Sequence, residues 1–241
     1  MNFNKIRLHI SSPRIDRFLI ASGKNKTKAQ RLYKANIRIA QSFFPLLNVV
    51  EVVLRNGVNT ILTGYFTDPD WIMNQKKGFM SHATLTYIDK RSGKKVVNDY
   101  LKKEVEKAEK RILKNGSVPT SGKVIAEQTF GFWTDLFEVH HYRILKGRPI
   151  QIFKHLPVGF GRKEVCDKLT DIRRFRNRMY HNEPICFVSG KIDFSKCESV
   201  YQDIIDILNW IDPEITKWIK DLNSVDLKIK NAKKIKYNPK Y

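Results

Sequence analysis

Glycine and proline are scarce in this sequence, with 12 and 9 residues among 241. Strand-rich folds need many turns, and turns draw on both residue types, so this scarcity argues against such a fold. Strand signals are confined to one weak segment, His82–Asp89, which also fits a helix. No internal repeat and no glycine-rich phosphate loop is present. The sequence therefore predicts an all-α fold.

Cysteine is also rare, and Cys166, Cys186 and Cys197 lie too far apart to form a recognisable set of metal ligands. An odd number of cysteines without a disulfide framework favours a reducing compartment. The first residues contain no apolar stretch, so no secretory signal is expected. The longest uncharged runs, such as residues 39–50, are shorter than a membrane span. We expect a cytoplasmic protein without membrane contact.

Acidic residues number 24 against 45 lysines and arginines, which gives a formal net charge of +21. Such a charge opposes folding by self-repulsion, and a polyanionic partner is its natural explanation. Nucleic acid is the first candidate partner and an anionic membrane surface is the second. A generally basic set of proteins in the host is the competing explanation.

Apolar residues recur at steps of three and four along several segments, which predicts amphipathic helices. In the first of them the apolar face includes Ile37 and Phe44, and Pro45 is expected to kink or break the helix. The segment from Lys228 to Tyr241 holds six lysines and few apolar residues, so a flexible basic tail is expected over 228–241. Helices are expected at about 13–23, 27–65, 96–114, 122–146, 164–181 and 195–222, the last of these interrupted at Asp212-Pro213, within one domain over residues 1–227.

The segment from Asp171 to Pro184 contains four arginines followed by a histidine near the end of a helix. Arginine binds phosphate oxygens with two parallel hydrogen bonds, and histidine can move protons near neutral pH. RNA supplies its own nucleophile, so its cleavage needs only proton transfer and charge stabilisation. The competing interpretation is a solvated arginine face with a histidine that favours the helix terminus. On an ideal helix Arg176 and His181 stand about 140° apart.

The segment Arg176-Asn-Arg-Met-Tyr-His181 matches the R-x(4–6)-H signature of HEPN ribonucleases. Two other segments, Val49-Val-Glu-Val-Val-Leu-Arg-Asn56 and Thr129-Phe-Gly-Phe-Trp133, lie in the order and at the separations of the abortive-infection (Abi, AbiD/AbiF-like) branch of that superfamily. Over residues 14–222 the chain therefore resembles an Abi-family HEPN protein.

This resemblance implies a HEPN-type helical bundle with additional helices, in which two protomers join their motifs across a two-fold axis. It implies a metal-independent endoribonuclease of an abortive-infection or toxin–antitoxin type of antiviral defence, without a cofactor. RNA is the implied substrate, and a small non-coding RNA is a candidate regulator. The alternative is a HEPN protein that binds RNA without cutting it. A DNA-binding regulator is disfavoured because no helix-turn-helix pattern is apparent.

The resemblance also assigns roles to residues. Arg176 would stabilise the charge that develops on the phosphate, His181 would be the general acid or base, and Asn177 would orient one of them. Glu51 is expected either to brace a motif arginine or to line the cleft. The other residues expected to bind RNA or support the site are Arg55, Asn56, Arg174, Arg178 and Tyr180.

Two further segments are interpreted as structural. Thr129–Trp133 is expected to pack in the core, with its glycine allowing a close approach between helices. His140 and His141 are adjacent, so on a helix they are expected to point to different sides. No metal site is therefore expected.

Overall fold

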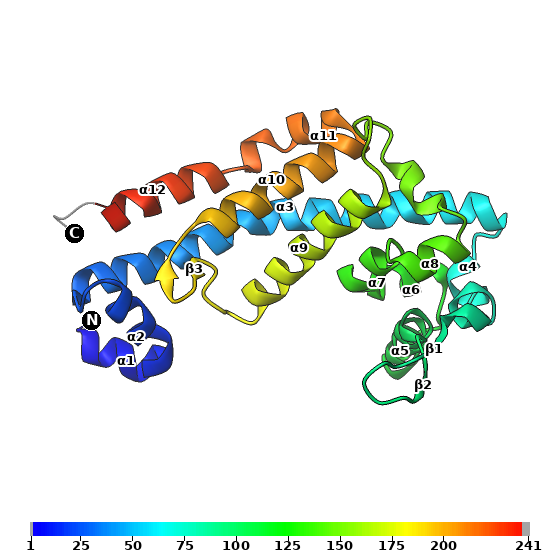
Figure 1. Cartoon of the computed structure of the whole chain (residues 1–241), viewed down its shortest axis with the longest axis horizontal. Helices are drawn as coiled ribbons and strands as arrows, with labels where there is room; N and C mark the ends of the chain where they lie inside the picture. Colours follow the sequence, from blue (N-terminus) through cyan, green and yellow to red (C-terminus); the bar gives the residue numbers. More distant parts are fainter. Residues whose placement is uncertain (1, 238–241) are drawn as a thin grey trace. The chain divides into compact units, whose positions relative to one another are not determined.

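The computed structural model describes residues 2–237, which form two compact units. Unit 1 contains residues 2–49, 174–209 and 213–237, and unit 2 contains residues 50–173 and 210–212. Helices dominate the described residues, and the strands form only two short hairpins. Figure 1 follows the chain through these elements. The all-α class is confirmed, whereas the single domain over 1–227 and the HEPN-type bundle stay predictions.

Unit 1 combines the N-terminal helices, the first part of a 41-residue helix and the C-terminal region. Its elements are α1 (Phe3–Ile10), α2 (Ser12–Ala21), the first part of α3 (Lys26–Phe66), the end of α9 (Arg162–Tyr180), the hairpin β3 (Phe187–Val188) and β4 (Lys191–Ile192), α10 (Ser195–Ile211), α11 (Pro213–Trp218), η4 (Lys220–Leu222) and α12 (Val225–Tyr237).

Aromatic rings and one buried amide connect α2, α3, β3 and the chain after α9 in unit 1. The Phe18 ring meets the rings of Tyr33 and Phe187 edge to face, at centroid distances of 5.4 and 4.9 Å. Asn36, which is buried in α3, accepts a hydrogen bond of 2.9 Å from the backbone N–H of Ile185. The amide thereby satisfies a buried backbone donor and fixes the chain that follows α9.

Unit 2 contains mostly short helices and one longer, highly charged helix. Its elements, besides parts of α3 and α9, are α4 (Trp71–Asn74), η1 (Phe79–Ser81), η2 (Ala83–Leu85), β1 (Thr86–Ile88), β2 (Lys95–Val97), α5 (Tyr100–Lys114), α6 (Ser121–Glu127), α7 (Phe130–Asp135), α8 (Val139–Ile144) and η3 (Arg148–Ile152). The antiparallel pair β1–β2 sets Thr86 opposite Val97. Helix α5 packs against α6 and α7.

The segment Thr129–Trp133 lies in the core of unit 2, as predicted. Phe130, Phe132 and Trp133 are almost completely buried in α7. A Cβ atom on Gly131 would lie 2.8 Å from the Tyr100 hydroxyl oxygen, closer than side chains pack. The glycine therefore permits the close approach of α7 and α5 that its place in the sequence predicted.

The predicted helix boundaries hold for the long helices and fail for the short ones. The segments 27–65 and 164–181 correspond closely to α3 and α9. The helix predicted over 96–114 begins only at Tyr100, because residues 95–97 form strand β2 and pair with β1. The single helix predicted over 122–146 is wrong, because Gln128, Thr129 and Glu138 adopt extended backbone and divide it into α6, α7 and α8.

The prediction of a flexible tail from Lys228 is wrong for residues 228–237, which belong to α12. The helix buries Val225, Ile229 and Ala232 and leaves its five lysines exposed or partly exposed. A few apolar residues at helical spacing are thus enough to fix this charged segment to unit 1. The remainder of the predicted tail, 238–241, lies outside the described residues.

Helix α3 is the one helix among residues 2–237 that is long and apolar enough to span a membrane. The uninterrupted uncharged runs in this helix are too short to predict such a segment, because charged residues divide them. The core helix of a soluble protein meets the same criteria, and Ile39, Phe43, Leu46 and Leu54 of α3 are fully buried. The cytoplasmic location stays a prediction.

All three cysteines are free and buried. Burial raises the pKa of the Cys186 thiol to about 12 and raises the pKa values of Cys166 and Cys197 as well. The Cys197 thiol donates to the backbone carbonyl of Ile185 at 3.4 Å. These side chains serve as core residues.

Candidate nucleic-acid interface

His181 caps the C-terminus of α9 and is exposed to solvent. Its backbone N–H donates to the Asn177 carbonyl at 3.0 Å, which continues the helical pattern by one residue. Asn182 then adopts a left-handed backbone (φ 54°), and the N–H groups of Asn182 and Glu183 donate back to Met179 and Arg178. This is a Schellman-type helix end. It fixes the backbone of His181 and leaves its imidazole in solvent.

Arg176 stands one turn before the end of the helix and packs on Tyr180. Its guanidinium carbon lies 4.5 Å from the centroid of the Tyr180 ring, a cation–π contact between residues four positions apart. Tyr180 is 54% exposed, so one face of the ring remains available to solvent. Asn177 is exposed on the same final turns. The three predicted catalytic residues therefore share one helix end.

The other two motif arginines differ in their surroundings. Arg178 is committed to the chain that follows the helix: its Nε donates to Glu183 at 3.2 Å and Nη2 donates to the Pro184 carbonyl at 2.7 Å. Through these contacts Arg178 stabilises the end of the helix and the chain that follows it. Arg174 is exposed and suits contact with a phosphate. The predicted RNA-binding role therefore fits Arg174 better than Arg178.

A groove runs between α3 and the end of α9, beside the capping residue His181. One part has a volume of about 270 Å³ and includes Arg14, Tyr33, Asn36 and Gln41 together with Asn182 and Glu183. An adjoining part, of about 430 Å³, is lined by Ala40, Gln41, Phe44, Met179, Tyr180 and Asn182. The groove thus combines aromatic rings, side-chain amides and one arginine, which are the groups that bind unpaired nucleobases.

Sequence reasoning missed the part of this groove that α3 supplies. Phe44 and Ile37 were assigned to the buried face of the helix, but they are 56% and 40% exposed. Both fall at helical spacing with truly buried residues, so periodicity alone does not separate them. Gln41 and Arg14 carry no sequence signal. Pro45 lies inside the continuous α3, and the predicted break is absent from that described helix.

The predicted supporting residues Glu51, Arg55 and Asn56 follow one another along α3 in unit 2. The Arg55 Nε donates to the Asn56 Oδ1 at 3.3 Å, and Asn56 is exposed. Because the motif residues from Arg174 onward belong to unit 1, the part that Glu51, Arg55 and Asn56 play in the site stays a prediction.

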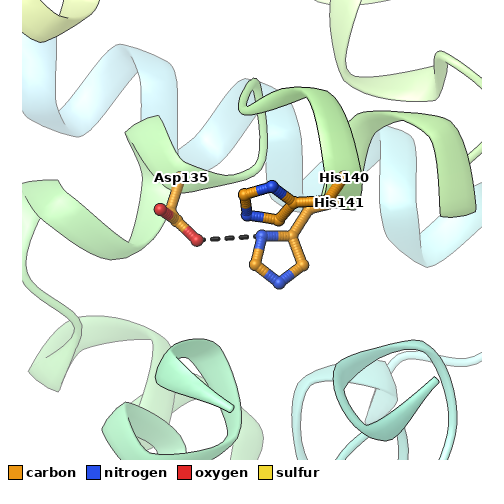
Figure 2. Close-up of side chains that lie close together, drawn as sticks. All are labelled: Asp135, His140 and His141. Atoms are coloured by element: carbon orange, nitrogen blue, oxygen red, sulfur yellow. Dashed lines mark ion pairs between the residues drawn. The ribbon is translucent and has the colours of Figure 1, made fainter. Parts of the chain in front are cut away.

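The interpretation of His140 and His141 as residues pointing apart is wrong. Their ring centroids lie 4.7 Å apart, and potential ligand atoms of Asp135, His140 and His141 all lie within 4.8 Å of one another. Figure 2 shows the carboxylate of Asp135 and both imidazoles gathered together. Adjacent helical residues differ by about 100° rather than 180°, so side-chain rotation is enough to bring their rings together. Residues able to hold a metal ion are therefore present in unit 2.

No family model matches this chain, and neither a curated protein nor a solved structure is significantly similar to it.

Proposed function

We propose that this chain is an endoribonuclease whose chemistry is carried by Arg176 and His181, with Asn177 as the orienting residue. The observation that carries the proposal is the exposure of His181 at the end of α9, beside a groove lined by aromatic rings and amides. An exposed imidazole can exchange protons with a substrate, and the groove offers surfaces for the adjacent bases. The resemblance to Abi-family HEPN ribonucleases is part of the same proposal.

The proposed reaction is an attack by the 2′-oxygen of RNA on the neighbouring phosphorus. The 2′-hydroxyl loses its proton to a base, the bond from phosphorus to the 5′-oxygen breaks, and that oxygen receives a proton from an acid. The products are a 2′,3′-cyclic phosphate and a 5′-hydroxyl. Arg176 would stabilise the additional negative charge on the phosphate, and His181 would transfer one of the protons. A metal ion is not needed for these steps.

Two protomers would supply both the base and the acid. One chain contains one motif histidine, whereas attack and departure each involve a proton transfer. A symmetric homodimer doubles the motif, and two-fold dimers are the commonest soluble assemblies. The concentration of positive charge at such a site would oppose association, so RNA should tighten the dimer. A small non-coding RNA as regulator, and a role in abortive infection, belong to this proposal on the resemblance alone.

The decisive experiment incubates the purified chain with end-labelled RNA in EDTA and identifies the product termini. Native protein should yield cyclic-phosphate ends, and His181→Ala should cleave about 10²–10⁴-fold more slowly. His155→Ala is the matched control, because His155 is also exposed but lies in unit 2. Equal loss in both variants would contradict the assignment. RNA binding by native protein without cleavage would favour the non-cleaving alternative.

The composite site is tested by mixing Arg176→Ala with His181→Ala. Each variant alone should cleave much more slowly than native protein, and a mixed dimer should regain part of the activity if each protomer contributes a different group. Light scattering with and without RNA reports the assembly. A monomer that cleaves at the full rate would exclude a shared site.

A further inference from the structure

Two histidines and an aspartate lie close together in unit 2, and in sequence they precede the arginine-rich motif. Asp135 ends α7, and His140 and His141 lie in α8, which begins after the three intervening residues 136–138. The side chain of His141 is completely buried, and that of Asp135 is 15% exposed. His141 Nδ1 lies 2.9 Å from Asp135 Oδ2, as the dashed line in Figure 2 marks.

The burial of His141 calls for an explanation. Among the described residues neither ring nitrogen meets a hydrogen-bond partner of acceptable geometry, although Nδ1 is close to Asp135. The Asp135 Oδ2 atom is likewise buried without such a partner. A buried polar atom that lacks a hydrogen bond costs about 1–3 kcal/mol. A positive species between the imidazole and the carboxylate would remove this cost at His141 Nδ1 and Asp135 Oδ2.

From these contacts we infer that Asp135, His140 and His141 form a binding site for one divalent transition-metal ion, with Zn²⁺ as the best fit. Two imidazole nitrogens and one carboxylate oxygen are a ligand set that zinc accepts, with a water in the fourth position. Ligand atoms of a tetrahedral zinc site stand about 3.3–3.4 Å apart for bonds of about 2.0–2.1 Å. The separations in the cluster run from 2.9 Å to at most 4.8 Å and thus bracket this value.

The surroundings of His140 also suit a metal ligand. Burial, followed by the nearby imidazole of His141, lowers the pKa of His140. His140 Nε2 lies 2.6 Å from the amide nitrogen of Asn98, in the loop between β2 and α5. An ion that uses this nitrogen competes with the amide. A carboxylate at position 98 would remove that competition and offer a fourth ligand.

Bound metal would connect α7 and α8 across the loop 136–138. Both helices have only six residues and gain little stability by themselves. An ion held at both ends of this loop would therefore stabilise the native protein in proportion to its concentration above the dissociation constant. This inference does not rest on the proposed ribonuclease activity, because its test measures metal binding without RNA.

The test is a titration of the metal-free full chain with Co²⁺ and Zn²⁺ at about pH 7.5. Co²⁺ should bind in one equivalent and show the visible bands of a four-coordinate site, and Zn²⁺ should displace it and raise the melting temperature. His140→Ala and Asp135→Asn should each weaken binding at least about 100-fold, since changes to outer partners of a metal site already cost 10–100-fold. Asn98→Asp should strengthen it.

The controls cover folding and rival ligands. His155→Ala should bind Co²⁺ as the native protein does. His141 is buried, so the partly exposed His140 and Asp135 are the positions to change, with circular dichroism confirming that each metal-free variant is folded. Equal binding by native protein, His140→Ala and Asp135→Asn would overturn the site. An absence of binding would also overturn it and would leave a plain His141–Asp135 ion pair. A thiolate charge-transfer band in the Co²⁺ spectrum would overturn it as well, because it would show that cysteine is a ligand.

Discussion

Two histidines show how differently the two units use the same residue type. His181 in unit 1 is exposed at a helix end, where backbone hydrogen bonds fix its main chain. His141 in unit 2 is completely buried beside a carboxylate. An exposed imidazole can meet a substrate, whereas a buried one must satisfy its nitrogens within the protein. Exposure rather than sequence spacing therefore separates a histidine suited to catalysis from one suited to metal binding.

The largest effect is expected in α12, where buried and exposed apolar residues lie two positions apart. Ile229 is 2% exposed and Leu227 is 56% exposed. Ile229→Ala should lower the free energy of unfolding by about 2–5 kcal/mol through lost burial and a cavity. Leu227→Ala should change it by at most about 0.5 kcal/mol. Urea unfolding of the full chain measures both, and similar values for the two variants would mean that α12 is not packed as described.

The exposed rings of the groove should affect RNA binding and not stability. Phe44→Ala and Tyr180→Ala should each weaken binding of single-stranded RNA by about 5- to 150-fold, which corresponds to about 1–3 kcal/mol of stacking per base. Tyr87→Ala is the control, because Tyr87 is equally exposed but belongs to the hairpin of unit 2. Fluorescence anisotropy at fixed salt gives the affinities. If Tyr87→Ala weakens binding as much as the others, the groove is not the binding surface.

In the core of unit 2, Gly131→Ala should destabilise the protein by about 1–3 kcal/mol, because the new methyl group overlaps the Tyr100 hydroxyl. Adding Tyr100→Phe to this variant should recover part of the loss. Gly122→Ala is the matched control, since a Cβ there meets no atom within 4 Å and alanine favours the helix α6. Thermal unfolding of the four proteins forms the comparison. A loss that Tyr100→Phe leaves unchanged would assign the cost to the backbone of α7.

The smallest effect concerns pH and His140. Burial lowers its pKa in the folded state below the ordinary value of 6.5, so the unfolded chain binds more protons below that pH. The contribution of His140 to stability is therefore greatest above pH 6.5 and declines as the pH falls toward the folded pKa. Urea unfolding in a chelator at about pH 7.5 and about pH 5.5 should show a smaller difference for His140→Asn than for native protein. His155→Asn should retain the native difference.

Periodicity predicted the long helices because each repeats its buried face over many turns. The bounds of α3 and α9 agree with the prediction to within one or two residues. The same reasoning merged α6, α7 and α8, since the extended residues Gln128 and Glu138 carry no strong turn signal. Composition did not predict the helix α12, where three buried apolar residues outweigh the effect of the many lysines. Charge describes which side of a helix faces solvent and does not decide whether the helix packs.

The candidate site was only partly predictable for a related reason. The motif segment is continuous in sequence, so Arg176, Asn177 and His181 are recognisable by their spacing. The groove joins α9 to Arg14 and Phe44, which lie more than 130 positions earlier in the sequence, and only the folded chain brings such residues together. The Asp135 cluster depends on side-chain rotation and on the break before α8, neither of which residue spacing reveals.

The buried thiols have a practical consequence for work in solution. Cys166, Cys186 and Cys197 are shielded, and their raised pKa values leave almost no thiolate at neutral pH. A maleimide dye should therefore not react with the native chain. A cysteine introduced by Glu183→Cys, at the rim of the groove, would then be the single labelled position. The emission of the attached dye would report the binding of a nucleic acid in real time.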